Sequence, residues 1–301
     1  MNNTFTKARA LVYRNARPIE LTRWQYHFEG GSKDAVLTVL SQYQNQDGGF
    51  GHALEPDSWN PNSSPIQTWE ATQVLYNIDW QDATHPIVQN ILRYLASGQE
   101  FNGKRWYGQI ESNNDYPHAP WWGWKPYEEQ SYNPTACLAG FIVKFANKDG
   151  DLYKLGCRIV READTAYREP VDMHTAMCYL KMWQYCKQAE ATDLIDLDDL
   201  EQRLRKQAKH IISQNKEAWK TEYVCTPIWF ANTPESIFYA DNKELFDYQC
   251  EYIVDYWENE PKDVPWSWDG YPEEFAISKN RLKVYDAIKH MLYLRNFGKI
   301  K

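Results

Sequence analysis

Residues 44–51 read Gln-Asn-Gln-Asp-Gly-Gly-Phe-Gly, and this octamer carries the strongest information about the fold. It follows apolar residues at 36, 39, 40 and 43, which is the i, i+3, i+4, i+7 spacing of an amphipathic helix. Gly48 and Gly49 allow positive φ and a tight exit from that helix. We expect Phe50 to pack back over the helix end and the Gln44 amide to cap neighbouring backbone groups. The octamer therefore predicts a helix end closed by an aromatic ring.

Weaker copies of this helix end recur along the chain, each with a polar residue followed five to seven positions later by an aromatic one. The spacings of the polar residues from position 44 onward are 55, 63, 52 and 46, about the length of a helical hairpin plus a loop. One hairpin cannot bury its own apolar face, so five or six hairpins that pack on each other are predicted. The four copies are Gln99 to Trp106, Glu162 to Tyr167, Gln214 to Trp219 and Glu260 to Trp266.

Helical signals also dominate the rest of the sequence. Ser32 can cap a helix that opens at residue 33, and Pro86 and Pro134 stand where a first helical turn tolerates proline. The helical apolar spacing recurs at 71–78, 138–145, 173–180, 246–257 and 284–292. We expect ten to twelve helices and find no convincing run of alternating strand residues. The sequence predicts an all-α fold with one domain over residues 1–301.

The octamer resembles the Q-x-x-D-G-G-F/W-G repeat of the terpenoid cyclases and the protein prenyltransferase β subunits. The longer run from Gly48 to Asp57 looks like a set of small bacterial proteins that are labelled by this repeat. The resemblance implies an α/α toroid (barrel) of inner and outer helix rings. It also implies that the loops at one end surround the mouth of a central cavity. The repeat itself is structural, so it does not supply a function.

Composition limits the classes of function. A chain with 43% hydrophobic and 25% charged residues is not expected to be disordered throughout. Its net charge of −8 makes nucleic acid an unexpected partner, because the phosphate backbone is also negative. No stretch of about 18 apolar residues predicts a membrane span, and the first residues do not resemble a secretory signal. We therefore expect a cytoplasmic protein with reduced cysteines, and the sequence gives no oligomeric state. The cysteines are Cys137, Cys157, Cys178, Cys186, Cys225 and Cys250.

Two motifs of the resembled families are matched only in part. Asp196-Leu197-Asp198-Asp199 fits the D-x-D-D string with which class II terpene cyclases protonate an olefin, and Asp198 would be the buried acid. Its polar surroundings favour a capped helix N-terminus instead. The D-x-C zinc pair of the prenyltransferases is absent. His174 and Cys178 share a helix face that suits a metal, but we interpret them as core-lining, so no metal is assigned and the cofactor stays unknown.

The loop after the octamer holds the candidate catalytic residues. His52, Glu55 and Asp57 follow the glycine turn within six residues and could do acid–base work if they line a cavity. The alternative is a polar loop whose carboxylates bind backbone amides and cap the next helix.

Two aromatic clusters, at residues 115–124 and 266–274, are the candidate ligand-binding segments. Aromatic faces attract cations and also stack on sugar rings, and nearby carboxylates can serve as acid and base. The alternative is that these rings only plug the ends of a barrel. The candidate residues are Asp115, Trp121, Trp122, Trp124, Trp266, Trp268, Asp269 and Glu273.

Three hypotheses for the function follow. The first is an enzyme that acts on an isoprenoid-like or other hydrophobic small molecule, with the tryptophans as cavity walls. The second is a carbohydrate-active hydrolase or lyase, supported by two carboxylates about 5 to 9 Å apart across a groove. The third is a non-catalytic binding or scaffold protein, in which His52, Glu55 and Asp57 are fully hydrogen-bonded to the backbone.

Overall fold

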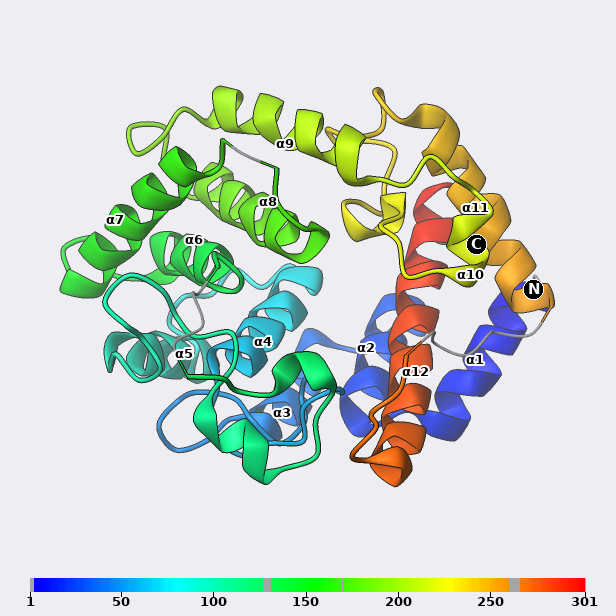
Figure 1. Ribbon diagram of the computed structural model, residues 1–301, viewed down its shortest axis with the longest axis horizontal. Coiled ribbons are helices and arrows are strands. Elements are labelled where there is room, and N and C mark those ends of the chain that lie inside the picture. The colour runs from blue at the N-terminus through cyan, green and yellow to red at the C-terminus, as the bar shows by residue number, and fades with distance from the viewer. Residues whose placement is uncertain (1–2, 127–130, 169, 260–265, 301) are drawn as a thin grey trace. The chain divides into compact units, whose positions relative to one another are not determined.

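The structure is a computed structural model that describes residues 3–126, 131–168, 170–259 and 266–300. Over these residues the chain forms twelve α-helices and four short 3₁₀ helices (Figure 1). Extended backbone pairs only at isolated bridges in the described part of the chain, so no sheet is present there. The predicted all-α class is confirmed. Glu260, the start of the last predicted repeat copy, lies outside the described residues.

The chain divides into two compact units, which we describe separately. The central unit is Leu40–Gln207, and the terminal unit combines Met1–Val39 with Ala208–Lys301. The prediction of one domain over the whole chain stays a prediction. The central unit contains η1 (Ser41–Tyr43), α4 (Pro65–Asn77), α5 (Pro86–Ala96), η2 (Glu111–Asp115), η3 (Pro120–Trp122), α6 (Thr135–Phe145), α7 (Asp151–Ala166) and α8 (Met173–Gln188). The terminal unit contains α1 (Asn3–Asn15), α2 (Pro18–Phe28), α10 (Ala218–Thr221), η4 (Pro227–Trp229), α11 (Lys243–Glu258) and α12 (Pro272–Asn296). Two helices, α3 (Lys33–Leu40) and α9 (Leu197–Ile211), each have residues in both units.

Helix α6 forms the centre of the core of the central unit. All its residues except Lys144 are buried, as expected for a helix that is apolar on every side. It packs against α7 and α8, and α4 and α5 also contact it (Figure 1). A Cβ at Gly140 would lie 2.8 Å from the Cα of Met182, so the small residue allows α6 and α8 to approach closely.

The octamer forms the helix end that the sequence predicts. Gly48 has φ +98°, and the Gln44 amide donates to the Gly48 carbonyl at 3.0 Å and to the Ile87 carbonyl of α5 at 3.2 Å. Phe50 is fully buried. The turn is thus closed by its own aromatic ring and tied to the following hairpin.

The second repeat copy makes an equivalent contact. The backbone N–H of Phe50 donates to the Thr68 hydroxyl of α4 at 3.1 Å, and the N–H of Trp106 donates to the Thr135 hydroxyl of α6 at 2.9 Å. Trp106 is also fully buried. The aromatic residues of the other copies, Tyr167 and Trp219, are buried, and Trp266 is half-buried.

Two of the three predicted helix starts are present as capping hydrogen bonds, while α6 begins directly after Pro134 without a side-chain cap. The Ser32 hydroxyl accepts the Ala35 N–H at 3.1 Å, and the His85 ring accepts the Ile87 N–H at 3.3 Å ahead of α5. In the terminal unit α1 packs against α11 and α12, and α2 packs against α12. All six cysteines lie in the described residues, where they are buried and free of disulfides.

Candidate functional site

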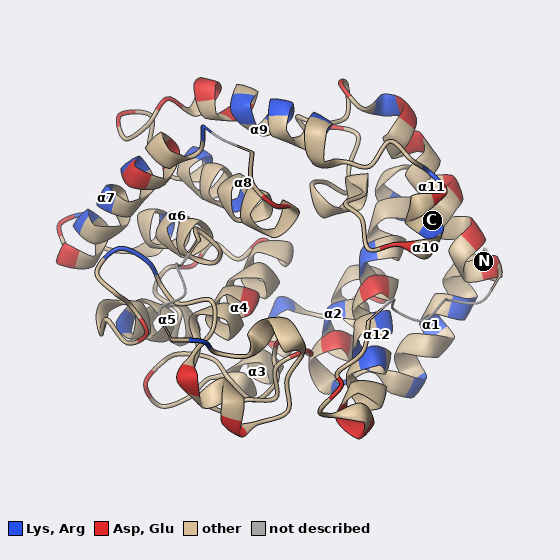
Figure 2. Cartoon of the chain, in the orientation of Figure 1, with Lys and Arg blue, Asp and Glu red and all other residues tan. Residues whose placement is uncertain are grey.

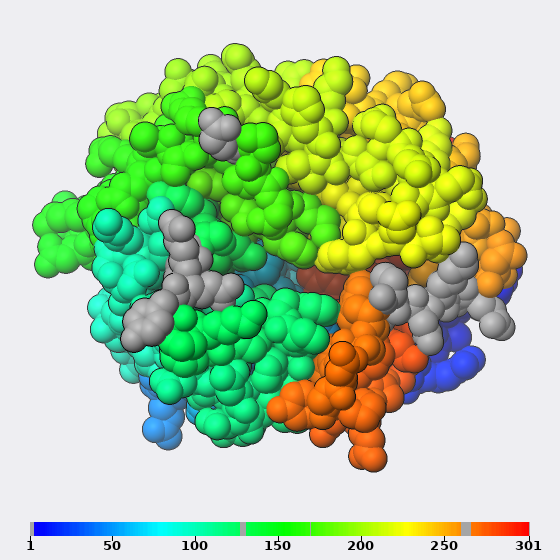
Figure 3. Space-filling view, viewed as in Figure 1, coloured from blue at the N-terminus to red at the C-terminus, as the bar shows by residue number. Residues whose placement is uncertain are grey.

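Two loops of the central unit pair with each other and bring together most of the candidate residues. They are residues 48–64 and 108–124, here called the paired loops. The Trp59 N–H donates to the Pro117 carbonyl at 2.9 Å, and the Ala119 N–H donates to the Asp57 carbonyl at 2.9 Å. The second of these loops, blue-green in Figure 3, forms part of the surface of the central unit in that view.

Helix α4 fixes the first loop from inside the core. The side chain of Gln67 is fully buried, where its Oε1 accepts the Leu54 N–H at 2.8 Å and its Nε2 donates to the Asn60 carbonyl at 2.9 Å. His52 and Ala53 both have positive φ, +60° and +59°, which turns the chain sharply just before the Leu54 anchor. The loop therefore has a defined shape.

Buried amides join the two loops. Asn60 Nδ2 donates to the Ser112 hydroxyl and to Asn113 Oδ1, both at 2.9 Å. Asn113 in turn donates to the Trp122 carbonyl at 2.9 Å. Asn60 and Asn113 are buried, so these bonds form in a low-dielectric interior. Asp57 and Trp122 therefore belong to one hydrogen-bonded layer.

The three candidate catalytic residues lie in very different environments. His52 is exposed, and its ring bonds with Asn45 Oδ1 at 2.9 Å rather than with either carboxylate. Glu55 is half-buried, and its Oε1 lies 3.4 Å from the Asp57 N–H that donates to it. Asp57 is only 6% exposed, and its Oδ1 is buried without a hydrogen-bond partner. His52 and Asp57 therefore share no hydrogen bond in the structure.

Burial changes the acidity of Asp57. Removal of this carboxyl from water raises its pKa from 3.8 to about 7, because the charged form loses more solvation than the neutral form. A carboxyl with this pKa can both give and take a proton near neutral pH.

The tryptophans of the second loop are held by side-chain amides. Gln109 donates to the Trp121 carbonyl at 3.1 Å, and Asn114 exchanges two hydrogen bonds with the backbone of Trp124, at 2.9 and 3.2 Å. Trp121 is 42% exposed, and Trp122 and Trp124 are half-buried. The backbone of this tryptophan segment is therefore held in place, and the Trp121 ring is partly exposed. Asp115 is exposed.

The sequence analysis missed His118 in this region. An isolated bridge pairs its backbone with Ser58, the neighbour of Asp57, and its Nδ1–H donates to the Tyr116 carbonyl at 2.7 Å. A Cβ at Gly123 would lie 3.2 Å from His118 Nε2, so the imidazole is packed under the tryptophan segment. The only signal for His118 in the sequence is its place within the aromatic run at 115–124. Its pairing with Ser58 could not be predicted, because the two residues lie 60 positions apart.

The second aromatic cluster belongs to the terminal unit. Trp266 is half-buried and contacts Tyr223 edge-on, with 5.0 Å between the ring centroids. Trp268 is buried, and its ring centroid lies 5.9 Å from that of Phe275. Asp269 and Glu273 are both exposed, and Asp269 accepts the Ser267 hydroxyl at 2.8 Å. Trp268 is therefore part of the core of its unit.

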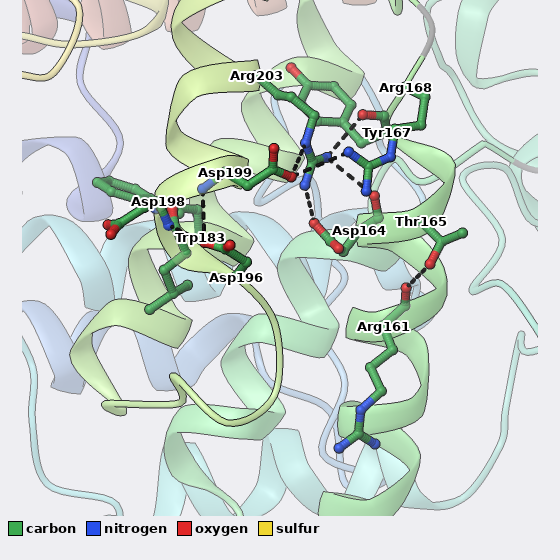
Figure 4. A network of polar contacts seen from close by, with 11 residues as sticks. Arg161, Asp164, Thr165, Tyr167, Arg168, Trp183, Asp196, Asp198, Asp199 and Arg203 are labelled. Atoms are coloured by element: carbon green, nitrogen blue, oxygen red, sulfur yellow. Dashed lines mark hydrogen bonds and ion pairs between the residues drawn. The ribbon is translucent and has the colours of Figure 1, made fainter.

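The aspartate run at 196–199 is a helix start, as its polar surroundings predict. Asp196 Oδ1 accepts the N–H groups of Asp198 and Asp199 at 3.1 and 3.0 Å (Figure 4). Asp198 is exposed, so it is not the buried acid of the cyclase interpretation. Asp199 accepts from Arg203 at 2.9 Å and from Arg168 at 3.2 Å, in an ion-pair network that links α9 to the end of α7.

The predicted metal-suited pair lies on α8, where His174 in the first turn is half-buried. Cys178 is buried, and its thiol contacts Asn133 Oδ1 at 3.4 Å. Over the described residues, no group of three or more His, Cys, Asp or Glu side chains is arranged to hold a metal ion.

Charge and hydropathy add little to these assignments. Figure 2 shows acidic and basic residues mixed along α7, α9 and α11. No described helix combines the length and the apolar character needed to cross a bilayer.

No protein-family model, curated protein or solved structure matches the chain. The function must therefore be argued from the site itself.

Proposed function

We propose that the paired loops bind a small hydrophobic molecule and that Asp57 exchanges a proton with it, which makes the protein an acid–base enzyme. The observation that carries the proposal is the buried Asp57 carboxyl, whose Oδ1 has no hydrogen-bond partner. Buried polar atoms in folded proteins are nearly always hydrogen-bonded. A buried carboxylate oxygen without a partner therefore indicates that a bound ligand supplies the missing hydrogen bond.

A purely structural role predicts a different environment for this residue. A carboxylate that caps a turn accepts backbone N–H groups, which lower its pKa. Asp57 shows the opposite, since burial raises its pKa to about 7. In the same loop Glu55 accepts the Asp57 N–H at 3.4 Å, so the capping role is filled by a neighbour. Asp57 is thus the better candidate of the two for a general acid at neutral pH.

The surroundings favour a hydrophobic molecule with an olefin or a carbonyl group. Protonation of such a group by Asp57 leaves a carboxylate and a cation, and the Trp121 and Trp122 rings supply faces that attract a cation. Loss of a proton from the neighbouring carbon to the carboxylate restores the acid and moves the double bond. This cycle balances without any co-reactant.

A ligand screen followed by isotope incorporation tests the proposal. Thermal shifts would be measured with neutral terpenoids, allylic diphosphates and oligosaccharides, since a ligand at 100 times its Kd adds about 2.7 kcal/mol of stability. Each compound that binds would then be incubated with the protein in D₂O, and deuterium in C–H positions would be measured by mass spectrometry. Isoprenoid-like compounds should bind and take up deuterium.

Two variants separate chemistry from binding. Asp57→Asn should keep the thermal shift but lose deuterium uptake, and Trp121→Ala should weaken the shift. Asp149→Asn, an exposed aspartate between α6 and α7, serves as the matched control and should change neither. Uptake that survives in Asp57→Asn, or binding of oligosaccharides alone, would refute the proposal.

For the whole chain, we propose the α/α toroid of five to six hairpins that the octamer resembles. The equivalent contacts of Phe50 with Thr68 and of Trp106 with Thr135 support a repeated unit. Small-angle X-ray scattering tests closure, because a compact particle of this length has a radius of gyration of about 19 Å. A markedly larger radius would show that the two units do not close into one ring.

A further inference from the structure

An arginine of the terminal unit is buried without a counter-ion. Arg23 lies on α2 and is only 5% exposed. Its guanidinium lies 5.0 Å from the centroid of the Tyr285 ring of α12, and its Nε is buried without a hydrogen-bond partner. Among the described residues no carboxylate forms an ion pair with it. Glu20, three positions earlier, is engaged by Arg17.

Such an arginine is an unusual feature of a folded chain. Buried charges are normally paired, because moving a charge out of water costs several kcal/mol unless a partner compensates. The Tyr285 ring attracts the cation but leaves the in-plane donors of the guanidinium unused. The site therefore has a positive charge and a free hydrogen-bonding edge.

A second orphaned group lies one helical turn away. His27 is at i+4 from Arg23 and thus on the same side of α2, and its Nε2 is also buried without a partner. Burial, followed by the charges of Arg23 and Arg295, lowers the pKa of His27 to about 3. The imidazole is therefore neutral here, chiefly because it is buried and secondly because two arginines lie near it.

The backbone that presents these groups is firmly held. The Trp24 ring packs against the rings of Phe5 and Phe28, with 5.2 and 4.5 Å between ring centroids. Its Nε1–H donates a hydrogen bond to Glu29 Oε1 at 2.9 Å. The Arg295 guanidinium of α12 donates to the His27 carbonyl. The backbone that carries the two orphaned groups is thus fixed before any ligand binds, which lowers the entropy cost of binding.

We infer that Arg23 and His27 form a binding site for an oxyanion, the carboxylate or phosphate group of a small molecule. The planar fork of a guanidinium matches either group with two parallel hydrogen bonds. A neutral imidazole can add a third bond by donating its Nε2–H. The site belongs to the terminal unit, and its inference does not depend on the proton chemistry proposed for Asp57.

Nuclear magnetic resonance of the arginine Nε–Hε groups tests this inference on the full chain. Inorganic phosphate and acetate would each be titrated at constant ionic strength, and Arg23→Gln would assign the Arg23 signal by its absence. At least one of the two anions should saturate a shift of this signal, and which of them does so identifies the group that the site prefers. If neither anion moves the Arg23 signal, the inference is wrong.

Calorimetry of variants adds an independent measurement. Arg23→Gln should weaken binding of the active anion by about tenfold to a hundredfold, as expected for loss of a charged hydrogen-bond donor. The matched control is Arg14→Gln on α1, where the arginine is exposed. Equal losses in both variants would show that the anion responds only to net charge, which overturns the assignment. If Arg23→Gln does not fold, Arg23→Lys assigns the Arg23 signal by its absence. The titration of His27→Phe then decides, because that variant should weaken binding while the Arg23 signal remains visible.

Discussion

Replacing Asp57 with Asn should remove a specific pH dependence of stability. In the folded chain the pKa of this carboxyl is raised from 3.8 to about 7, so between these values the folded state binds more protons than the unfolded state. Wild-type stability therefore falls as pH rises through this window, by about 4 kcal/mol in total and about 2.7 kcal/mol between pH 5 and pH 8. Asn has nearly the same shape and stays neutral, so this contribution disappears in Asp57→Asn. From pH 5 to pH 8, the variant should gain about 2.7 kcal/mol relative to wild type.

Urea titrations at both pH values, followed by tryptophan fluorescence, measure this difference directly. Asp115→Asn is the matched control, because Asp115 is exposed on the second of the paired loops. Its effect should stay within about 0.5 kcal/mol at both pH values. If the free energy of unfolding of Asp57→Asn differs from that of wild type by the same amount at pH 5 and pH 8, the Asp57 carboxylate is well solvated or paired in solution. The argument for a neutral-pH acid would then fail.

Three further predictions test the repeat and a buried amine. Gly48→Ala should be clearly more destabilising than Gly103→Ala in urea titrations. Both glycines have positive φ, but an added Cβ at position 48 would lie 2.1 Å from a backbone oxygen of α5, whereas the space at position 103 is open. Equal losses of stability in the two variants would contradict the close approach of α5. Thr68→Val and Thr135→Val should each cost about 1–3 kcal/mol, because each leaves a buried N–H unpaired, and a loss in only one would show that the two contacts are not equivalent. Burial lowers the pKa of Lys181 to about 7, so competitive acetylation read by mass spectrometry should give this amine a midpoint near that pH, and a midpoint near 10.5 would show that it is solvated.

The helices and the repeat turn could be predicted because their determinants are local. In the octamer, the two glycines, the Gln44 amide and the Phe50 ring lie within seven positions, and the structure uses them as expected. The helix start at Ser32 likewise depends on one side chain and an N–H three residues later. The apolar spacing at 138–145 predicted a helix but not that α6 is buried on nearly every side, because that depends on what α7 and α8 cover.

The candidate site could be located but not assembled from the sequence. Asp57 was singled out by its place after the glycine turn, yet the loop that pairs with its own loop lies far away in sequence, and Asn60 bonds to Asn113 across 53 positions. Amide side chains in loops carry no spacing rule, so nothing in the sequence predicts such a bond. His52 lies close to Asp57 in sequence, but the positive φ values at His52 and Ala53 turn its side chain toward Asn45.

Arg23 shows most clearly why burial has to be known before charge can be interpreted. In the sequence it is one basic residue on an amphipathic helix with Glu20 three positions earlier, a spacing typical of an ordinary surface ion pair. In the structure Glu20 bonds to Arg17 at the start of α2, which leaves Arg23 buried and unpaired. Asp57 and Arg23 thus share one property in separate units, an ionisable group whose burial lowers stability and whose folded surroundings do not compensate it. If both serve ligands, neutral replacements should stabilise the free protein at neutral pH and lower the activity of each site, deuterium uptake for Asp57→Asn and anion binding for Arg23→Gln. A structural role would not produce this trade-off.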